Sequence, residues 1–265
     1  MNRAVVSRLV RQQRLLAPLQ MAFTFAWGYL LVALFATSDK FGSMLDQQAE
    51  MLGGAWALIG LDPLRQWMTI GLLDPPFFLG GGAFAIAIGL RCVAGELQDG
   101  SLQLAITRPI SRRSWFASHL VVMIPGSFLI AAFYALGCVV AASVTTPRGS
   151  LDVGYTVLAS LEAGLLFTTF GAFALLFSSF ATERGRAMAW TLGVLVVMYM
   201  LSFLLPLWGT GENLAKLTPF GWYRPGPVLQ TGEVPWGDVL ALALFAAVPL
   251  AVAGWRFARR DLAAG

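Results

Sequence analysis

The chain has 265 residues and a formal net charge of +4; 57% of its residues are hydrophobic and only 12% are charged. A soluble globular domain carries about 25% charged residues, so this composition excludes a protein with a fully water-exposed surface. The mean hydropathy of +0.71 indicates an integral membrane protein instead.

The first fourteen residues combine arginines with apolar residues at helical spacing. Arg3 and Arg11 alternate with Val5, Val6 and Leu9, which is typical of a basic amphipathic helix lying on a membrane surface. We expect such a short interfacial helix here; a frayed basic tail is the alternative. The apolar run that follows is longer than the hydrophobic region of a signal peptide, so we interpret it as an uncleaved first span.

Six long apolar runs follow one another along the chain, each with about the 20 residues that a helix needs to cross the hydrocarbon core. They do not alternate apolar and polar residues as barrel strands do. We therefore expect an all-α integral membrane protein with six transmembrane helices, forming a single membrane domain over residues 1–265. The expected spans are about 15–36, 77–95, 115–142, 153–180, 187–208 and 237–255.

The positions of the Lys and Arg residues predict the orientation. With both termini in the cytoplasm, thirteen of the eighteen basic residues fall on the inner side and five on the outer side. Cytoplasmic loops retain basic residues, so we expect cytoplasmic N- and C-termini and a multi-pass protein of the inner (plasma) membrane. Topology accounts for the positive charge, and we expect no nucleic-acid partner.

The sequence lacks the motifs of enzymes, metal sites and nucleotide sites. The sole histidine, His119, excludes an HExxH zinc site, and Cys92 and Cys138 do not form a set of metal ligands. Neither Lys40 nor Lys216 lies in a phosphate-binding loop. We expect no catalytic residue, no metal and no cofactor on this chain, and we expect His119 to be an interfacial side chain.

One charged residue within an expected span requires an explanation. Glu162 lies about ten residues into the fourth span, and intramembrane carboxylates usually face a cavity or a partner, so we expect it in a substrate pathway. The alternative is a wet position close to the outer surface. Four small residues of the second span are expected to allow close helix packing: Gly80, Gly81, Gly82 and Gly89.

The expected inner loop, about 96–113, is the most informative segment. Leucines alternate with polar residues after Glu96, Pro109 stops any helix, and Ser111 suits the N-cap of the next one. These features alone fit the inner loop of many polytopic proteins.

Three stretches add a family resemblance. They are Gly95-Glu96 with Gly100-Ser101-Leu102 and Arg108-Pro109-Ile110-Ser111-Arg112; Leu217-Thr218-Pro219-Phe220; and Phe257-Ala258-Arg259-Arg260-Asp261-Leu262. Together they resemble signatures of the permeases of type-2 ATP-binding-cassette (ABC) exporters. Ser101 stands where threonine is usual in that family, and His119 stands about where a lysine often follows.

The resemblance implies the transmembrane permease subunit of an ATP-driven exporter, which forms the translocation pathway as a dimer. Its first cytoplasmic loop would couple it to separate ATPase subunits, which would bind ATP and Mg. The coupling residues implied are Glu96, Gly100, Arg108, Pro109, Ser111 and Arg112. The alternative for the arginines is an anchoring contact with lipid phosphates. The alternative function is a secondary carrier or channel-like membrane protein without an ATPase.

Overall fold

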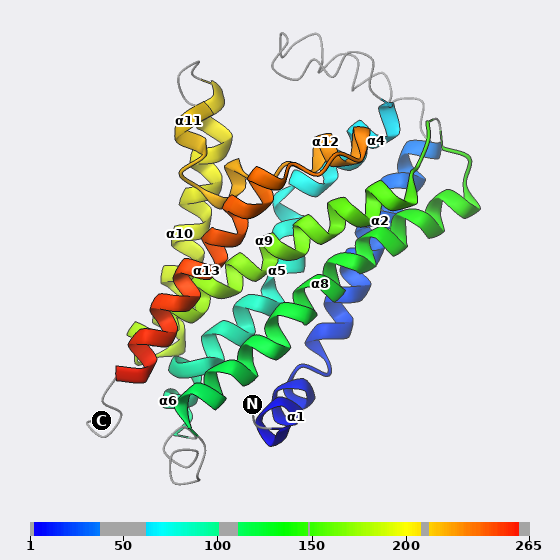
Figure 1. Ribbon diagram of the computed structural model, residues 1–265. Coiled ribbons are helices and arrows are strands. Elements are labelled where there is room, and N and C mark those ends of the chain that lie inside the picture. The colour runs from blue at the N-terminus through cyan, green and yellow to red at the C-terminus, as the bar shows by residue number, and fades with distance from the viewer. Residues whose placement is uncertain (1–2, 38–61, 101–110, 148, 208–211, 260–265) are drawn as a thin grey trace.

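The computed structural model describes residues 3–37, 62–100, 111–147, 149–207 and 212–259. Within these ranges the chain is built from helices and contains no β-strand. In this described part of the chain, six helices are long and apolar enough to cross a membrane, and they run side by side in one bundle (Figure 1). The prediction of an all-α integral membrane protein with six transmembrane helices is therefore confirmed.

The spanning helices follow the expected order. They are α2 (Leu16–Thr37), α5 (Pro75–Leu90), α8 (Arg112–Val144), α9 (Val153–Phe180), α10 (Arg184–Leu204) and α13 (Trp236–Arg259). The second span continues past α5 through a π-helical turn, η1 (Arg91–Gly95), into the short helix α6 (Glu96–Gln98).

Shorter helices lie at the two ends of the bundle (Figure 1). The end with α1 (Arg3–Gln12), α6 and the last turn of α13 is called the α1 end below. The opposite end, called the α12 end, carries α4 (Pro63–Leu73), η2 (Leu205–Leu207), α11 (Glu212–Ala215), η3 (Pro219–Gly221) and α12 (Pro225–Thr231). The arginine distribution predicts that the α1 end is cytoplasmic, and that orientation stays a prediction.

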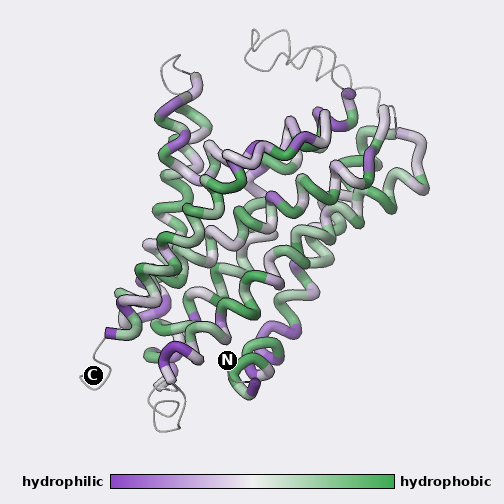
Figure 2. The backbone as a smooth tube through the Cα atoms, viewed as in Figure 1, coloured by the Kyte–Doolittle hydropathy of each residue, from purple (hydrophilic) through white to green (hydrophobic). Residues whose placement is uncertain are grey.

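The helix α9 lies at the centre of the bundle. α5, α8 and α13 all pack against it, and most of its residues are buried, whereas most of α10 is exposed. Hydrophobic residues dominate the middle of the long helices, and hydrophilic residues collect at the two ends (Figure 2). This distribution suits a bundle whose outer surface contacts lipid.

The glycines of α5 allow its close approach to neighbouring helices. A Cβ atom added at Gly81 would overlap the ring of Phe167, and one added at Gly82 would overlap the ring of Phe170. At Gly89 the added atom would meet the α9 backbone. The predicted packing role of these glycines is confirmed, since any larger side chain would push α5 away from α9.

Candidate functional site at the α1 end

The helix α1 is amphipathic, and the rest of the chain covers its apolar side. Val5 and Leu9 are buried, and they join a cluster that includes Trp115 near the start of α8 and Phe257 near the end of α13. The helix predicted from the arginine and valine spacing therefore exists. Its two buried residues contact protein, and its position at a membrane surface stays a prediction.

The second span changes its helical form just before the predicted coupling loop. The hydroxyl of Ser178, on α9, donates a hydrogen bond to the carbonyl of Leu90 at 3.0 Å. The same oxygen accepts hydrogen bonds from the amides of Val93, at 3.3 Å, and Ala94, at 2.9 Å. Because a π-helical turn interrupts the regular α-helical bonding pattern, this one side chain stabilises the turn at both its edges.

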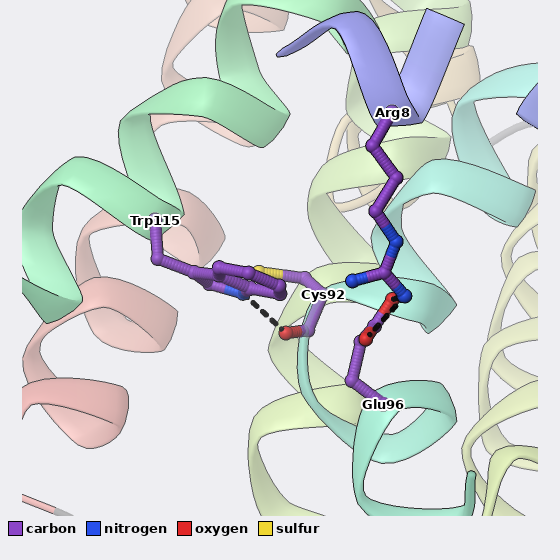
Figure 3. Close-up of polar contacts among 4 residues, drawn as sticks. All are labelled: Arg8, Cys92, Glu96 and Trp115. Carbon is purple, nitrogen blue, oxygen red and sulfur yellow. Dashed lines mark hydrogen bonds and ion pairs between the residues drawn. The ribbon is translucent and has the colours of Figure 1, made fainter. Parts of the chain in front are cut away.

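Glu96 follows this turn directly, and its side chain points into the protein (Figure 3). The residue is 3% exposed. Nη2 of Arg8, on α1, donates to both carboxylate oxygens at 3.0 and 2.9 Å. Beside this pair, the indole of Trp115 donates to the carbonyl of Cys92 at 3.0 Å. Charge-assisted hydrogen bonds are stronger than neutral ones, so the Arg8–Glu96 pair fastens α1 to the start of α6.

This placement bears on the role expected for Glu96. A carboxylate with so little exposure does not present itself to an incoming protein surface. The predicted part of Glu96 in ATPase coupling stays a prediction, and the geometry gives it an indirect route, through Arg8 and α1.

At the C-terminal end of the loop, α8 begins with a helix cap. The Ser111 hydroxyl accepts the amide of Ser114 at 3.2 Å, so its predicted N-cap role is confirmed. Nη1 of Arg112 donates to the carbonyl of Ala258 at 3.1 Å and lies 3.5 Å from that of Phe257. The last carbonyls of a helix lack intrahelical partners, and a cation there is favourable. Arg112 therefore ties the start of α8 to the end of α13.

The N-terminal end of the loop is hydrogen-bonded to α10. The side-chain oxygen of Gln98 accepts the backbone amide of Arg184, the first residue of α10, at 3.0 Å. Gly100 then has a φ of +67°, a left-handed conformation that glycine adopts without steric cost. Two of the predicted coupling residues, Arg108 and Pro109, lie outside the described residues.

His119 is fully buried rather than interfacial, so the expectation for this residue was wrong. It lies one turn beyond Trp115, whose carbonyl oxygen is 3.0 Å from Nδ1. Nε2 has no hydrogen-bond partner within the described part of the chain. α1 is one of the segments that pack against α8, the helix that carries His119. No group of three or more potential metal-binding side chains occurs in the described ranges.

Glu162 lies nearer the α12 end, and its carboxylate is inside the protein. Oε1 accepts the backbone amide of Arg224 at 2.8 Å, and the residue is 6% exposed. Oε2 and the hydroxyl of Tyr223 are both buried without a hydrogen-bond partner among the residues described. Burial raises the pKa of the Tyr223 phenol above its usual range, and the neighbouring Glu162 acts in the same direction, so the phenol stays protonated.

A sequence profile of the ABC-2 family transporter proteins matches residues 7–262. The chain belongs to the ABC-2 transporter family. The uncharacterized membrane protein YdbK of Bacillus subtilis (strain 168) is 30% identical to this ABC-2 protein over an alignment of 196 residues, which covers 68% of the present chain and 77% of YdbK. This ABC-2 protein is thus a multi-pass membrane permease with a role in transport.

Two residues of the site in this ABC-2 permease, Arg8 and Ser178, were not predicted from the sequence. Arg8 and Glu96 are 88 positions apart, and no local pattern pairs them. Ser178 is one hydroxyl near the end of an apolar span, which by itself predicts no partner. The packing of α1 against the bundle was predictable in outline, because the apolar side of an amphipathic helix packs against another surface.

Proposed function

We propose that this permease is the transmembrane subunit of an ATP-driven exporter that works as a dimer. Separate ATPase subunits bind at the α1 end through the segment 96–113, and ATP and Mg bind on those subunits. The complex lies in the inner membrane, with the α1 end in the cytoplasm.

The observation that supports this proposal most is the way both edges of the loop are connected. On one edge, Glu96 bonds to α1 through Arg8, and Gln98 bonds to the first residue of α10. On the other edge, Arg112 bonds to the last turn of α13. A force on the loop therefore reaches α1, α10 and α13 through direct hydrogen bonds, which is what coupling to ATP hydrolysis requires.

We assign Glu162 to the substrate pathway within this proposal. Support comes from its buried Oε2 and the buried Tyr223 hydroxyl, two polar atoms that lack hydrogen-bond partners within the described residues. Buried polar groups are costly unless a ligand or partner satisfies them. The Arg224 amide holds the carboxylate at the segment that joins η3 to α12, so movement of that segment would change the surroundings of Glu162.

The test is purification from the native membrane followed by reconstitution. We expect a separate ATPase to copurify with a permease dimer, and we expect the isolated permease to hydrolyse no ATP. Transport in vesicles should then require both subunits and ATP. Transport by the permease alone, driven by an ion gradient, would support the secondary carrier or channel instead and would overturn the proposal.

A matched pair of variants tests whether the ATPase binds at the α1 end. Arg112→Ala should lower the affinity for the ATPase about tenfold, as expected for the loss of a charged contact at an interface. Lys216→Ala removes the same charge at the α12 end, where Lys216 lies over the Trp222 ring, and should leave the affinity unchanged. Thermal unfolding of both variants separates weaker docking from a weaker fold. Equal affinities would show that Arg112 has no part in docking.

A further inference from the structure

A groove between α8 and α13 opens at the α1 end of the bundle. Its volume is about 510 Å³. Apolar side chains of two membrane-spanning helices form its walls, with Phe116 on α8 facing Leu250 and Trp255 on α13. Gly254 leaves the α13 wall without a side chain at this level, and an added Cβ atom would lie 3.4 Å from the Phe116 ring. The groove is therefore lined by apolar groups where it lies between α8 and α13.

The end of the groove is strongly basic. Arg112, Arg113 and Arg259 all line it, and among the described lining residues none is acidic. Arg113 and Arg259 are exposed. The guanidinium of Arg259 lies over the Trp255 ring, 4.7 Å from its centroid, a cation–π contact that holds it at the mouth.

The apolar walls and the basic end of the groove together indicate which molecule binds there. An acidic protein partner would use the arginines, but it would leave the apolar walls within the span unfilled. An anionic phospholipid matches both parts of the groove. In a bilayer its phosphate lies at the level of the helix ends, and its acyl chains run along the helices. Basic pockets between transmembrane helices at the cytoplasmic side bind such headgroups.

We propose that this groove is a binding site for an anionic phospholipid of the leaflet at the α1 end. The phosphate lies between Arg113 and Arg259, and an acyl chain lies along Phe116, Leu250 and Gly254. The bound lipid spans the α8–α13 contact that Arg112 closes with the Ala258 carbonyl. It therefore stabilises the pair of helix ends next to the predicted coupling loop.

The experiment places a fluorescent label in the groove. Ala251 lines the groove and is exposed, while the native Cys92 and Cys138 are buried, so a bimane reagent labels Ala251→Cys selectively. The labelled permease is reconstituted in phosphatidylcholine vesicles that contain either brominated phosphatidylglycerol or brominated phosphatidylcholine. We expect half-maximal quenching at about tenfold lower mole fraction of the anionic brominated lipid.

Two double variants separate a site from general surface charge. Arg113→Gln with Arg259→Gln should abolish the preference for phosphatidylglycerol. Arg184→Gln with Arg186→Gln removes the same charge from the start of α10, outside the groove, and should preserve it. Equal quenching by the two lipids in the parent protein, a preference that survives the first double variant, or an equal loss in both would overturn the proposal.

A third variant keeps the test decisive if the first double variant does not fold. Gly254→Leu fills the groove and leaves every arginine in place. It should remove the preference for phosphatidylglycerol, because the acyl chain loses its position beside Phe116. An unchanged preference in Gly254→Leu would overturn the proposal.

Discussion

Replacing Arg8 by alanine should release α1 from the bundle. The substitution removes both hydrogen bonds to Glu96, at 2.9 and 3.0 Å, and leaves the 3%-exposed Glu96 without its link to α1. The Arg8 side chain is 42% exposed, so solvent screens part of the interaction. We expect a cost of about 1–3 kcal/mol in the docking of α1, the range found when a charged hydrogen bond is lost.

Release of α1 can be measured by the rate at which Cys92 is chemically labelled. This thiol is fully buried, and it shares an apolar cluster with Val5 and Leu9 of α1, so local opening of α1 exposes it. Since about 1.4 kcal/mol is a factor of ten, the rate of labelling by a membrane-permeant maleimide should rise about 5- to 150-fold. The measurement uses a Cys138→Ala background, in which Cys92 is the only cysteine.

Arg11→Ala is the matched control, since it removes the same charge from an exposed position on the same helix. Its labelling rate should equal that of the parent protein. If Arg8→Ala labels Cys92 no faster than Arg11→Ala, the ion pair does not hold α1 in place, and the indirect route from Glu96 through α1 is refuted.

Two further predictions concern particular contacts, and a third concerns the orientation in the membrane. Ser178→Ala removes three hydrogen bonds from the π-helical turn and should lower the free energy of unfolding by about 1–3 kcal/mol; a loss no larger than that in exposed Ser143→Ala would show that the turn is stable without them. Glu162→Gln keeps an acceptor for the Arg224 amide and should fold normally but transport poorly in vesicles, and full transport would remove Glu162 from the pathway. A cysteine at Thr231 should react with an impermeant thiol reagent added outside the cell, and one at Ser111 should react only after the membrane is opened; the reverse pattern would invert the topology.

The sequence was sufficient for the fold because each span satisfies its own backbone. A helix of about 20 apolar residues bonds its amides and carbonyls internally, so its existence depends on local composition alone. The N-cap at Ser111 was predictable for the same reason, because its partner, Ser114, is three residues away. The packing glycines of α5 were also visible, since only small residues allow helices to approach so closely.

The contacts of the site depend on which helix ends lie side by side. No short stretch of sequence indicates that arrangement, because the partners are far apart along the chain. Arg112 was recognised as a basic residue of the loop, but its bond to the Ala258 carbonyl joins positions 146 residues apart. His119 was expected at an interface because it lies just inside the third span, beside a basic loop. Its burial depends on the segments that pack against α8, and α1 is one of them.

The central position of α9 has a consequence for biogenesis. Among the spans that the structure describes, α9 is the fourth in chain order, and α13, which packs against it, is the sixth. Its hydroxyls at Ser160, Thr168 and Thr169 bond to carbonyls one turn back within α9 itself. These three hydroxyls are therefore satisfied within α9 itself, without a contact to α13. A chain truncated before α13 should still insert the five preceding spans that the structure describes, and the defect should appear at helix assembly rather than at insertion.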